Sequence, residues 1–210
     1  YLYDRSGRMV RQLTRGNWDV TAFHGVHEAG DRIFFTAASE SPITRSVYSA
    51  SLDGGDMTRL AGGRGTHSAR FSPDFSFFTD TYSSIGTPPV TRLRRVADGS
   101  EVRVLEDNAE LVGKLEGLDL REPEFFTVQA DDGSTLNAWI MKPRDFDPGK
   151  TYPLLLYVYG GPGSQTVRDS WGGTRYLWHQ MLVRDGILVA SVDNRGTGAR
   201  GREFEKLTRS

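Results

Sequence analysis

Hydrophobic and polar residues alternate in short runs over the first hundred residues, and glycine-containing turns separate these runs. One plan occurs three times, at residues 1–13, 47–60 and 91–105. In each unit a run of strand length leads through a tight turn with glycine into a second run. This pattern is typical of a β-hairpin.

The hairpins recur at a nearly constant spacing, which we measured between corresponding leucines. The two intervals are 47 and 45 residues, for Leu13, Leu60 and Leu105. Further strands are predicted between the hairpins, at residues 32–37 and 76–82. Four short strands in about 40–50 residues is the period of a β-propeller blade. A β-sandwich is the competing interpretation, and the fixed repeat favours the propeller.

We therefore interpret residues 1–107 as the C-terminal blades of a β-propeller: two blades and the last hairpin of a third. A propeller closes with about 4–8 blades, so we expect others to precede Tyr1. Because Tyr1 lies inside a predicted strand and Ser210 follows soon after a glycine-rich loop, we expect the chain to be a piece of a longer polypeptide.

The pattern changes from repeated strands to mixed strands and helices after residue 107. Residues 108–122 are interpreted as a hinge, in which Asn108 is expected to cap a short helix. Leu111, Val112 and Leu115 would share one face of that helix. The remaining residues, 123–210, are predicted to begin with a hairpin around the Asp131-Asp132-Gly133-Ser134 turn.

An apolar run of strand length, residues 152–159, ends in Gly160-Gly161-Pro162. Such a run predicts a strand buried on both faces, as in a parallel sheet. The two glycines allow a sharp turn at the carboxyl end of the strand, where α/β sheets bind ligands. Tyr159 precedes them, and a phenol hydroxyl, with a reference pKa of about 10, donates at neutral pH. Tyr159 is therefore our candidate donor to an oxyanion.

A helix is predicted at residues 175–184, with Gly186 just past its end, and a buried strand at 187–192 that ends at Asp193. Strand, helix and strand in this order predict a parallel βαβ unit. The following loop spells a formal Gly-x-Gly-x-x-Gly at residues 196–201. Asp193-Asn194-Arg195 separates it from the strand, and it follows the second strand of the unit, so we do not favour a dinucleotide site.

Composition narrows the functional classes. The chain is 37% hydrophobic and 25% charged with a net charge of −1, and it has no long basic run. We expect a globular protein with no nucleic-acid partner. There is no cysteine, so neither disulfides nor thiolate metal sites are expected. No apolar run reaches the roughly 18–20 residues that span a bilayer.

No cofactor or metal is expected. His24 and His27 stand close to Glu28, but the local pattern is strand and turn, so we interpret them as surface or packing residues. His67 carries no functional signal, and His179 on the predicted helix is interpreted as a packing residue.

No Gly-x-Ser-x-Gly motif, the mark of a hydrolase nucleophile, occurs in the chain. Ser84 and Ser170 each have the second glycine of this motif, two residues after the serine, but lack the first glycine. We therefore interpret both as loop serines. In α/β-hydrolases the nucleophile, acid and histidine follow one another in the chain, and all three would lie after Ser210.

Two segments together resemble the prolyl oligopeptidase family of serine peptidases. They are Tyr159-Gly160-Gly161-Pro162-x-Ser164-Gln165 and Asp193-x-Arg195-Gly196-x-Gly198. The dipeptidyl peptidase IV branch is the most similar, because residues 103–108 and Gly16-x-Trp18-x-Val20 resemble it too. The resemblance implies an eight-bladed propeller followed by an α/β-hydrolase domain, of which residues 123–210 would be the first part.

By the same resemblance the intact protein is a serine peptidase that releases dipeptides ending in Pro or Ala from peptide N-termini, and the chain alone is inactive. Tyr159 would supply the oxyanion hydroxyl. Gly160, Gly161, Asp193 and Arg195 would shape the active-site loop. The glutamates that bind the substrate amine in this family have no counterpart here.

An acylaminoacyl peptidase, a tripeptidyl peptidase and a non-catalytic interaction protein therefore remain alternative functions of the intact protein. Peptides are the expected partners, a homodimer of the intact protein is compatible with the resemblance, and the compartment is the periplasm or the cytoplasm, with the periplasm favoured.

Overall fold

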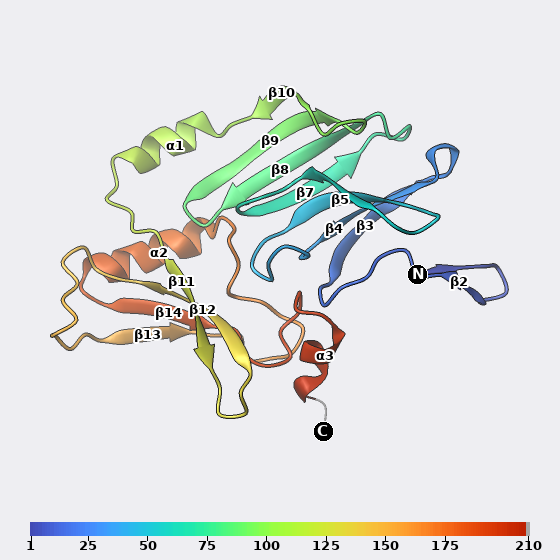
Figure 1. The fold of residues 1–210 in the computed structure, drawn as a ribbon. Coiled ribbons are helices and arrows are strands. Elements are labelled where there is room, and N and C mark those ends of the chain that lie inside the picture. The colour runs from blue at the N-terminus through green and yellow to red at the C-terminus, as the bar shows by residue number, and fades with distance from the viewer. Residues whose placement is uncertain (209–210) are drawn as a thin grey trace.

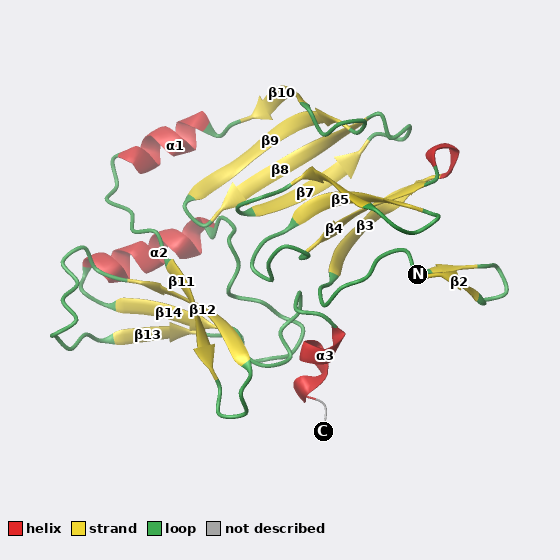
Figure 2. Cartoon of the chain, viewed as in Figure 1, coloured by secondary structure: helices red, strands yellow, loops and turns green. Residues whose placement is uncertain are grey.

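Short antiparallel strands make up the first half of the chain, as the alternating pattern predicts. The computed structural model describes residues 1–208. A small hairpin, β1 (Leu2–Tyr3) and β2 (Met9–Arg11), comes first. A four-stranded sheet follows, in which consecutive strands pair in the order β3-β4-β5-β6 (Figures 1 and 2). Its strands are β3 (Val20–His27), β4 (Arg32–Ala37), β5 (Ser46–Ser51) and β6 (Met57–Ala61), with a 3-10 turn, η1 (Glu28–Gly30), after β3.

The next sheet repeats this arrangement, with consecutive strands paired from β7 to β10. Two successive four-stranded antiparallel sheets, packed side by side, are the form of propeller blades. The prediction of two blades preceded by a hairpin is confirmed at the level of these strands. Their bounds are β7 (Thr66–Phe71), β8 (Phe77–Ser84), β9 (Thr87–Arg95) and β10 (Glu101–Glu106).

Aromatic side chains fill the space between the two blades. Phe34 of β4 is 1% exposed and its ring lies 4.8 Å from that of Phe71 and 4.9 Å from that of Phe75. Phe71 in turn stacks on the fully buried Phe78 at 5.1 Å. The blades therefore share one apolar core, which the hydrophobic effect stabilises.

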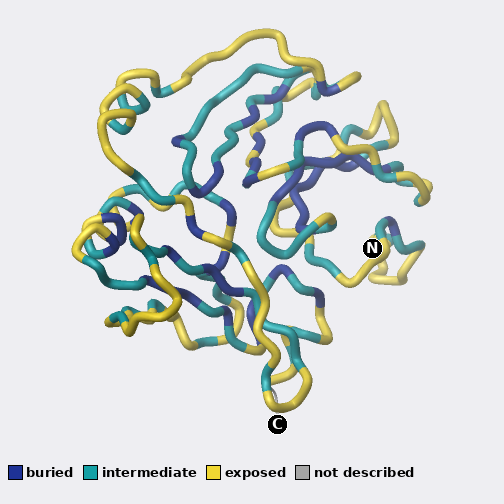
Figure 3. Tube along the Cα trace, turned by 60° about the vertical axis from the view of Figure 1, so that its left-hand side comes forward, coloured by how far each residue is buried: buried dark blue, intermediate teal, exposed yellow. Residues whose placement is uncertain are grey.

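The hinge contains α1 (Ala109–Glu116), which has no buried residue (Figure 3). Asn108 stands at the N-cap position of this helix, as predicted, but the expected capping by its side chain is wrong. Asn108 adopts a left-handed conformation and its side chain donates to the carbonyl of Pro89 at 2.6 Å. Asp107 takes the capping role instead, because its Oδ1 accepts a hydrogen bond from the amide of Ala109 at 2.9 Å.

The second half of the chain forms a mixed sheet in the order β11-β12-β14-β13, and α2 packs along it (Figure 1). β13 and β14 are parallel and are joined by α2, as predicted, and β14 is the buried central strand. The elements are β11 (Glu124–Gln129), β12 (Thr135–Met141), β13 (Leu154–Tyr157), α2 (Gly173–Arg184) and β14 (Leu188–Val192).

The prediction that the strand at 152–159 is buried on both faces is wrong for the described residues. β13 has only four residues and lies at the edge of the sheet. Leu154 and Leu156 are 57% and 52% exposed. The apolar composition predicted burial, but no described element packs over the outer edge of this strand.

The end of α2 has the predicted glycine cap. Gly186 has a φ of +83°, which a glycine adopts without strain. Its amide donates to the carbonyl of Val183 and the amide of Ile187 donates to the carbonyl of Leu182. These two bonds are a Schellman motif, and they direct the chain straight into β14.

The mixed sheet and the blades share a second apolar core. Ile85, in the turn between β8 and β9, is buried together with Trp139, Met141 and Val189 of the mixed sheet. Ile43 of the first blade packs against the same cluster. The described residues end with one short turn of helix, α3 (Arg202–Glu205), and a 3-10 turn, η2 (Lys206–Thr208). Within residues 1–208, no helix is both long and apolar enough to cross a membrane.

We expect Phe34→Ala to lower the free energy of unfolding of the intact protein by about 3–5 kcal/mol, because it leaves a cavity between the blades. Phe126→Ala, at a side chain that is 43% exposed, is the matched control and should cost less than about 1 kcal/mol. Urea unfolding measures both. Equal losses for the two variants would contradict the shared aromatic core.

Candidate functional site

Tyr159 lies two residues past the end of β13, at the carboxyl edge of the parallel strands. Gly160 follows with a φ of +81°, a conformation that favours glycine. Gly161 lies directly under the tyrosine ring, since a Cβ at this position would come 2.8 Å from Cε1 of Tyr159. The Gly-Gly pair therefore turns the chain and leaves room for the ring.

The Tyr159 side chain is 66% exposed, so its hydroxyl is accessible to a ligand. It does not point into a packed interior. The structure thus places a phenol donor at the edge of the sheet where α/β proteins bind their ligands.

Asp193 holds the loop that follows Tyr159. This carboxylate is 4% exposed and stands at the end of β14. Its Oδ1 accepts hydrogen bonds from the amide of Thr166 at 2.7 Å, the hydroxyl of Thr166 at 3.0 Å and the amide of Val167 at 3.1 Å. Asp193 therefore ties the Tyr159 loop to the neighbouring strand, a contact that sequence patterns did not predict.

The Arg195 guanidinium is half exposed and pairs with Asp132 at 2.7 Å, in the turn between β11 and β12. The adjacent Asn194 contacts the Tyr159 loop, because its Nδ2 lies 3.5 Å from the carbonyl of Gly161. The amide of Gly163 also donates to the carbonyl of Gly196 at 2.9 Å. These contacts brace the Tyr159 loop from the side.

A cavity of about 490 Å³ opens beside Tyr159, between its loop and the start of α2. Tyr157 and Arg175 line it, and the Arg175 guanidinium donates to the Tyr157 hydroxyl at 2.5 Å and lies over its ring. His179 lies at the bottom, 3% exposed, with no hydrogen-bond partner for Nε2 among the described residues. Burial and the charge of Arg175 lower the pKa of His179 below 6.5, so the ring is neutral at pH 7.

His179 packs against aromatic rings, as predicted. The centroids of Trp139, Tyr157 and Trp178 lie 5.6, 5.6 and 5.3 Å from its own. The blade histidines also serve packing: His24 contacts Phe71 and His27 stacks on Phe75.

His67 has a structural role that the sequence did not reveal. It lies within β7 and is buried, and its Nδ1 is 2.8 Å from Oδ1 of the fully buried Asp80. The other oxygen of Asp80 accepts from Nε of Arg94 at 2.9 Å. This buried hydrogen-bond network joins three strands of one blade.

Neither candidate serine has the setting of a nucleophile. Ser84 is not a loop residue: it ends β8, is 1% exposed and donates to Thr87. Ser170 lies in a loop and accepts from Nε of Arg168 at 3.2 Å.

The glycines at 196–201 serve packing between distant segments. A Cβ on Gly201 would come 2.9 Å from the backbone of Asn17. The Gly201 amide, at the start of the one-turn α3, donates to the carboxylate of Asp19 at 3.1 Å. A carboxylate and the blade backbone thus occupy the place where a dinucleotide phosphate would bind.

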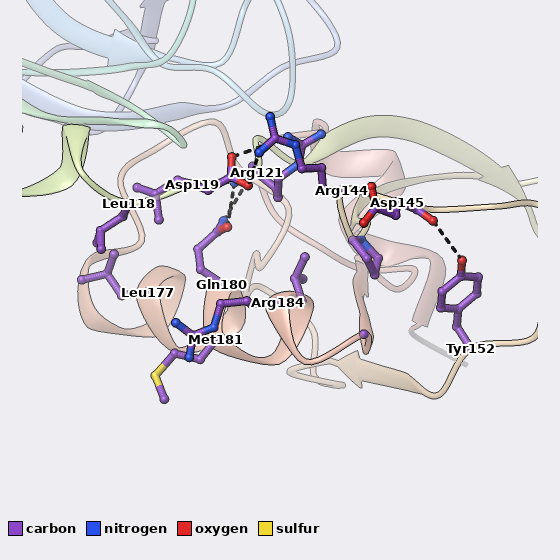
Figure 4. A pocket seen from close by; sticks show the side chains of 14 residues that line it. Leu118, Asp119, Arg121, Arg144, Asp145, Tyr152, Leu177, Gln180, Met181 and Arg184 are labelled. Atoms are coloured by element: carbon purple, nitrogen blue, oxygen red, sulfur yellow. Dashed lines mark hydrogen bonds and ion pairs between the residues drawn. The ribbon is translucent and has the colours of Figure 1, made fainter.

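A second cavity, of about 660 Å³, lies along the outer side of α2 and contains none of the predicted site residues (Figure 4). Its rim carries paired charges, because Asp119 accepts from Arg144 at 3.1 Å and lies 4.0 Å from Arg121. Leu177 and Met181 of α2 line its wall. An apolar cavity is often a ligand site, but this one does not lie at the carboxyl edge of the parallel strands, where Tyr159 stands.

Comparison with known proteins gives consistent matches. A family described as the dipeptidyl peptidase IV (DPP IV) N-terminal region matches residues 1–89. Dipeptidyl peptidase 4 of Arthroderma otae is 34% identical over 97% of this chain and 27% of that protein. Human dipeptidyl peptidase 8 is 32% identical over 92% of this chain and 22% of that protein.

The crystal structure of Porphyromonas gingivalis dipeptidyl peptidase 4 superposes with a TM-score of 0.91 at 43% identity. The match covers 99% of this chain and 29% of that one. The chain therefore spans about a quarter of the length of the relatives it matches.

We expect Asp193→Ala to destabilise the intact protein by about 1–3 kcal/mol, because it leaves the buried donors of Thr166 and Val167 unsatisfied. Arg195→Ala is the control. It breaks an exposed ion pair, which is worth about 0–1 kcal/mol. Thermal or urea unfolding would show the difference, and a larger loss for Arg195→Ala would contradict the assigned roles.

Proposed function

Because this chain belongs to the dipeptidyl peptidase IV family, we propose that the intact protein is a serine peptidase. It releases dipeptides from the N-termini of peptides, with Pro or Ala as the second residue, through an acyl-enzyme. Relatives named dipeptidyl peptidase 4 and 8 support a dipeptidyl peptidase function. The observation that carries the proposal is the accessible phenol of Tyr159 at the carboxyl edge of β13.

In this proposal residues 123–210 are the first part of an α/β-hydrolase domain, and residues 108–122 are the hinge from the propeller. The parallel pair β13–β14, connected by α2 and followed by a Gly-Gly loop, supports this assignment. The outer edge of β13 is unpaired among residues 1–208, and its leucines are exposed. A further parallel strand could pair with this edge, with its connecting helix over the face that carries these leucines, and would bring a nucleophilic serine close to Tyr159.

The reaction would then use Tyr159 as follows. The serine hydroxyl attacks the carbonyl carbon of the scissile amide while a histidine removes its proton, and the carbonyl oxygen becomes negatively charged. The Tyr159 hydroxyl donates a hydrogen bond to this oxygen. Because the charge is present only in the transition state and the intermediate, the bond lowers the barrier. The proton then passes from the histidine to the leaving amine, and water hydrolyses the acyl-enzyme.

The activity is tested with chromogenic anilides and the intact protein. We expect hydrolysis of Ala-Pro-p-nitroanilide and Gly-Pro-p-nitroanilide, and none of their N-acetylated forms, since a dipeptidyl peptidase requires the free amine. The isolated 210-residue chain should be inactive, because it contains no Gly-x-Ser-x-Gly motif. Preference for acetylated or tripeptidyl substrates would overturn the dipeptidyl assignment. Absence of both hydrolysis and fluorophosphonate labelling would identify a non-catalytic protein.

Tyr159→Phe in the intact enzyme should lower kcat by about 10²–10³-fold, as the loss of one oxyanion donor does. KM should change little, because the bond forms after substrate binding. Tyr152→Phe is the control, since its hydroxyl contacts only the loop at Asp145 and Asp147. An unchanged kcat for Tyr159→Phe would remove this residue from the mechanism.

A further inference from the structure

The loop after Tyr159 is attached to the first blade by a buried arginine. Arg45, just before β5, is 7% exposed. Its Nη2 donates to Oε1 of Gln165 at 2.6 Å, across the boundary between the blades and the mixed sheet. Gln165 returns the contact, because its Nε2 donates to the carbonyl of Pro42 in the same blade loop at 2.8 Å.

Arg45 is fixed on its own side as well. Its Nη1 donates to the carbonyls of Pro42 at 2.9 Å and Thr44 at 2.7 Å. Its backbone bridges the two blades, accepting from the amide of His67 and donating to the carbonyl of Gly65. The guanidinium therefore projects from the junction of both blades with little freedom to move.

The electrostatics of Arg45 are unusual for a buried cation. Its side-chain hydrogen bonds among the described residues go to neutral oxygens, not to a carboxylate. Burial, with a smaller effect from Arg168, lowers its pKa to about 10, and the charges of Asp19 and Asp193 offset part of this shift. A buried charge that hydrogen-bonds no carboxylate is a costly way to gain stability. The presence of an arginine at this buried position is better explained by its geometry, because the planar guanidinium binds three oxygens at once.

The position of Gln165 connects this contact to the candidate site. Gln165 lies six residues after Tyr159, lines the cavity beside it and donates to the carbonyl of Val167 at 3.0 Å. Asp193 holds the next two residues from the opposite side. Tyr159 itself is exposed, so the placement of its hydroxyl depends on how firmly this loop is held at both points.

We propose that Arg45 is a positioning residue of the reaction, which acts through Gln165 to hold the Tyr159 loop in the orientation that donates to the oxyanion. This inference rests on the proposed peptidase function. It assigns a role in catalysis to a blade residue 114 positions before the tyrosine. Small displacements of a catalytic group are costly, and a shift of about 1 Å can reduce a rate by about 100-fold.

Arg45→Met and Gln165→Leu are compared in the intact enzyme, with Arg32→Met as the matched control. Arg32 belongs to the same blade and bonds only Ser49 and Thr58 through its side chain. We expect each of the first two variants to lower kcat by about 10–100-fold with KM within about twofold. The double variant should be no slower than either one, because both remove the same contact. Arg32→Met should keep the wild-type kcat.

Hydrogen exchange of the peptide covering residues 160–168 gives a readout that does not depend on activity. It should accelerate in Arg45→Met and Gln165→Leu, whereas exchange in β4 and β5 should not change. If Arg45→Met does not fold, Gln165→Leu alone tests the inference, because it keeps Arg45 and the hydrogen bonds that Arg45 makes within the blade. Wild-type kcat in Gln165→Leu, or exchange at 160–168 equal to wild type, would overturn the inference. An inactive wild-type protein would instead overturn the proposed function, and exchange would still test the contact.

Discussion

Asp169 joins the loop between β13 and α2 to both blades. It is 5% exposed, and its Oδ1 accepts from the amide of Ile85 at 2.8 Å. Its amide donates to the carbonyl of Ile43 and its carbonyl accepts from the hydroxyl of Thr66, each at 2.9 Å. Since a buried carboxylate is costly without such donors, the loop has one favourable place against the blades. The positions of Gln165, Thr166 and the segment before them depend on it.

This arrangement makes the blades part of the candidate site. The inter-blade core around Phe34 fixes one blade against the other, and the core around Ile85 fixes both against the mixed sheet. A loop with few internal contacts is thereby held from two directions, by Asp193 behind it and by the blade loops in front. Rigid supports of this kind are what a preorganised donor needs, because electrostatic stabilisation works best when no reorganisation accompanies the reaction.

The exposed edge of β13 is consistent with the proposed hydrolase domain. Leu154, Leu156 and Val158 are all more than half exposed, although the same run of residues has the composition of a buried strand. An apolar unpaired edge favours pairing with another strand. In the proposed hydrolase domain that strand would carry the nucleophile. Pairing of that strand with β13 would then bury the edge and complete the active site at the same time.

Local sequence patterns predicted most strands of both blades, α2 with its glycine cap and the βαβ connection, but they missed β7 (Thr66–Phe71). These elements depend on alternation, turn residues and caps within a few positions of one another. The sequence likewise predicted the Gly-Gly turn after Tyr159, because glycine adopts the positive φ of Gly160 without strain.

Contacts between distant segments decided what these patterns left undetermined. The hydrogen bond between His67 and Asp80, the exposure of β13 and the capping of α1 by the side chain of Asp107 rather than that of Asn108 follow from how strands and loops meet in three dimensions. The bond from Arg45 to Gln165 joins residues 120 positions apart. Neither residue has a local pattern that reveals the other, because a side chain's partner is set by the folded path of the whole chain.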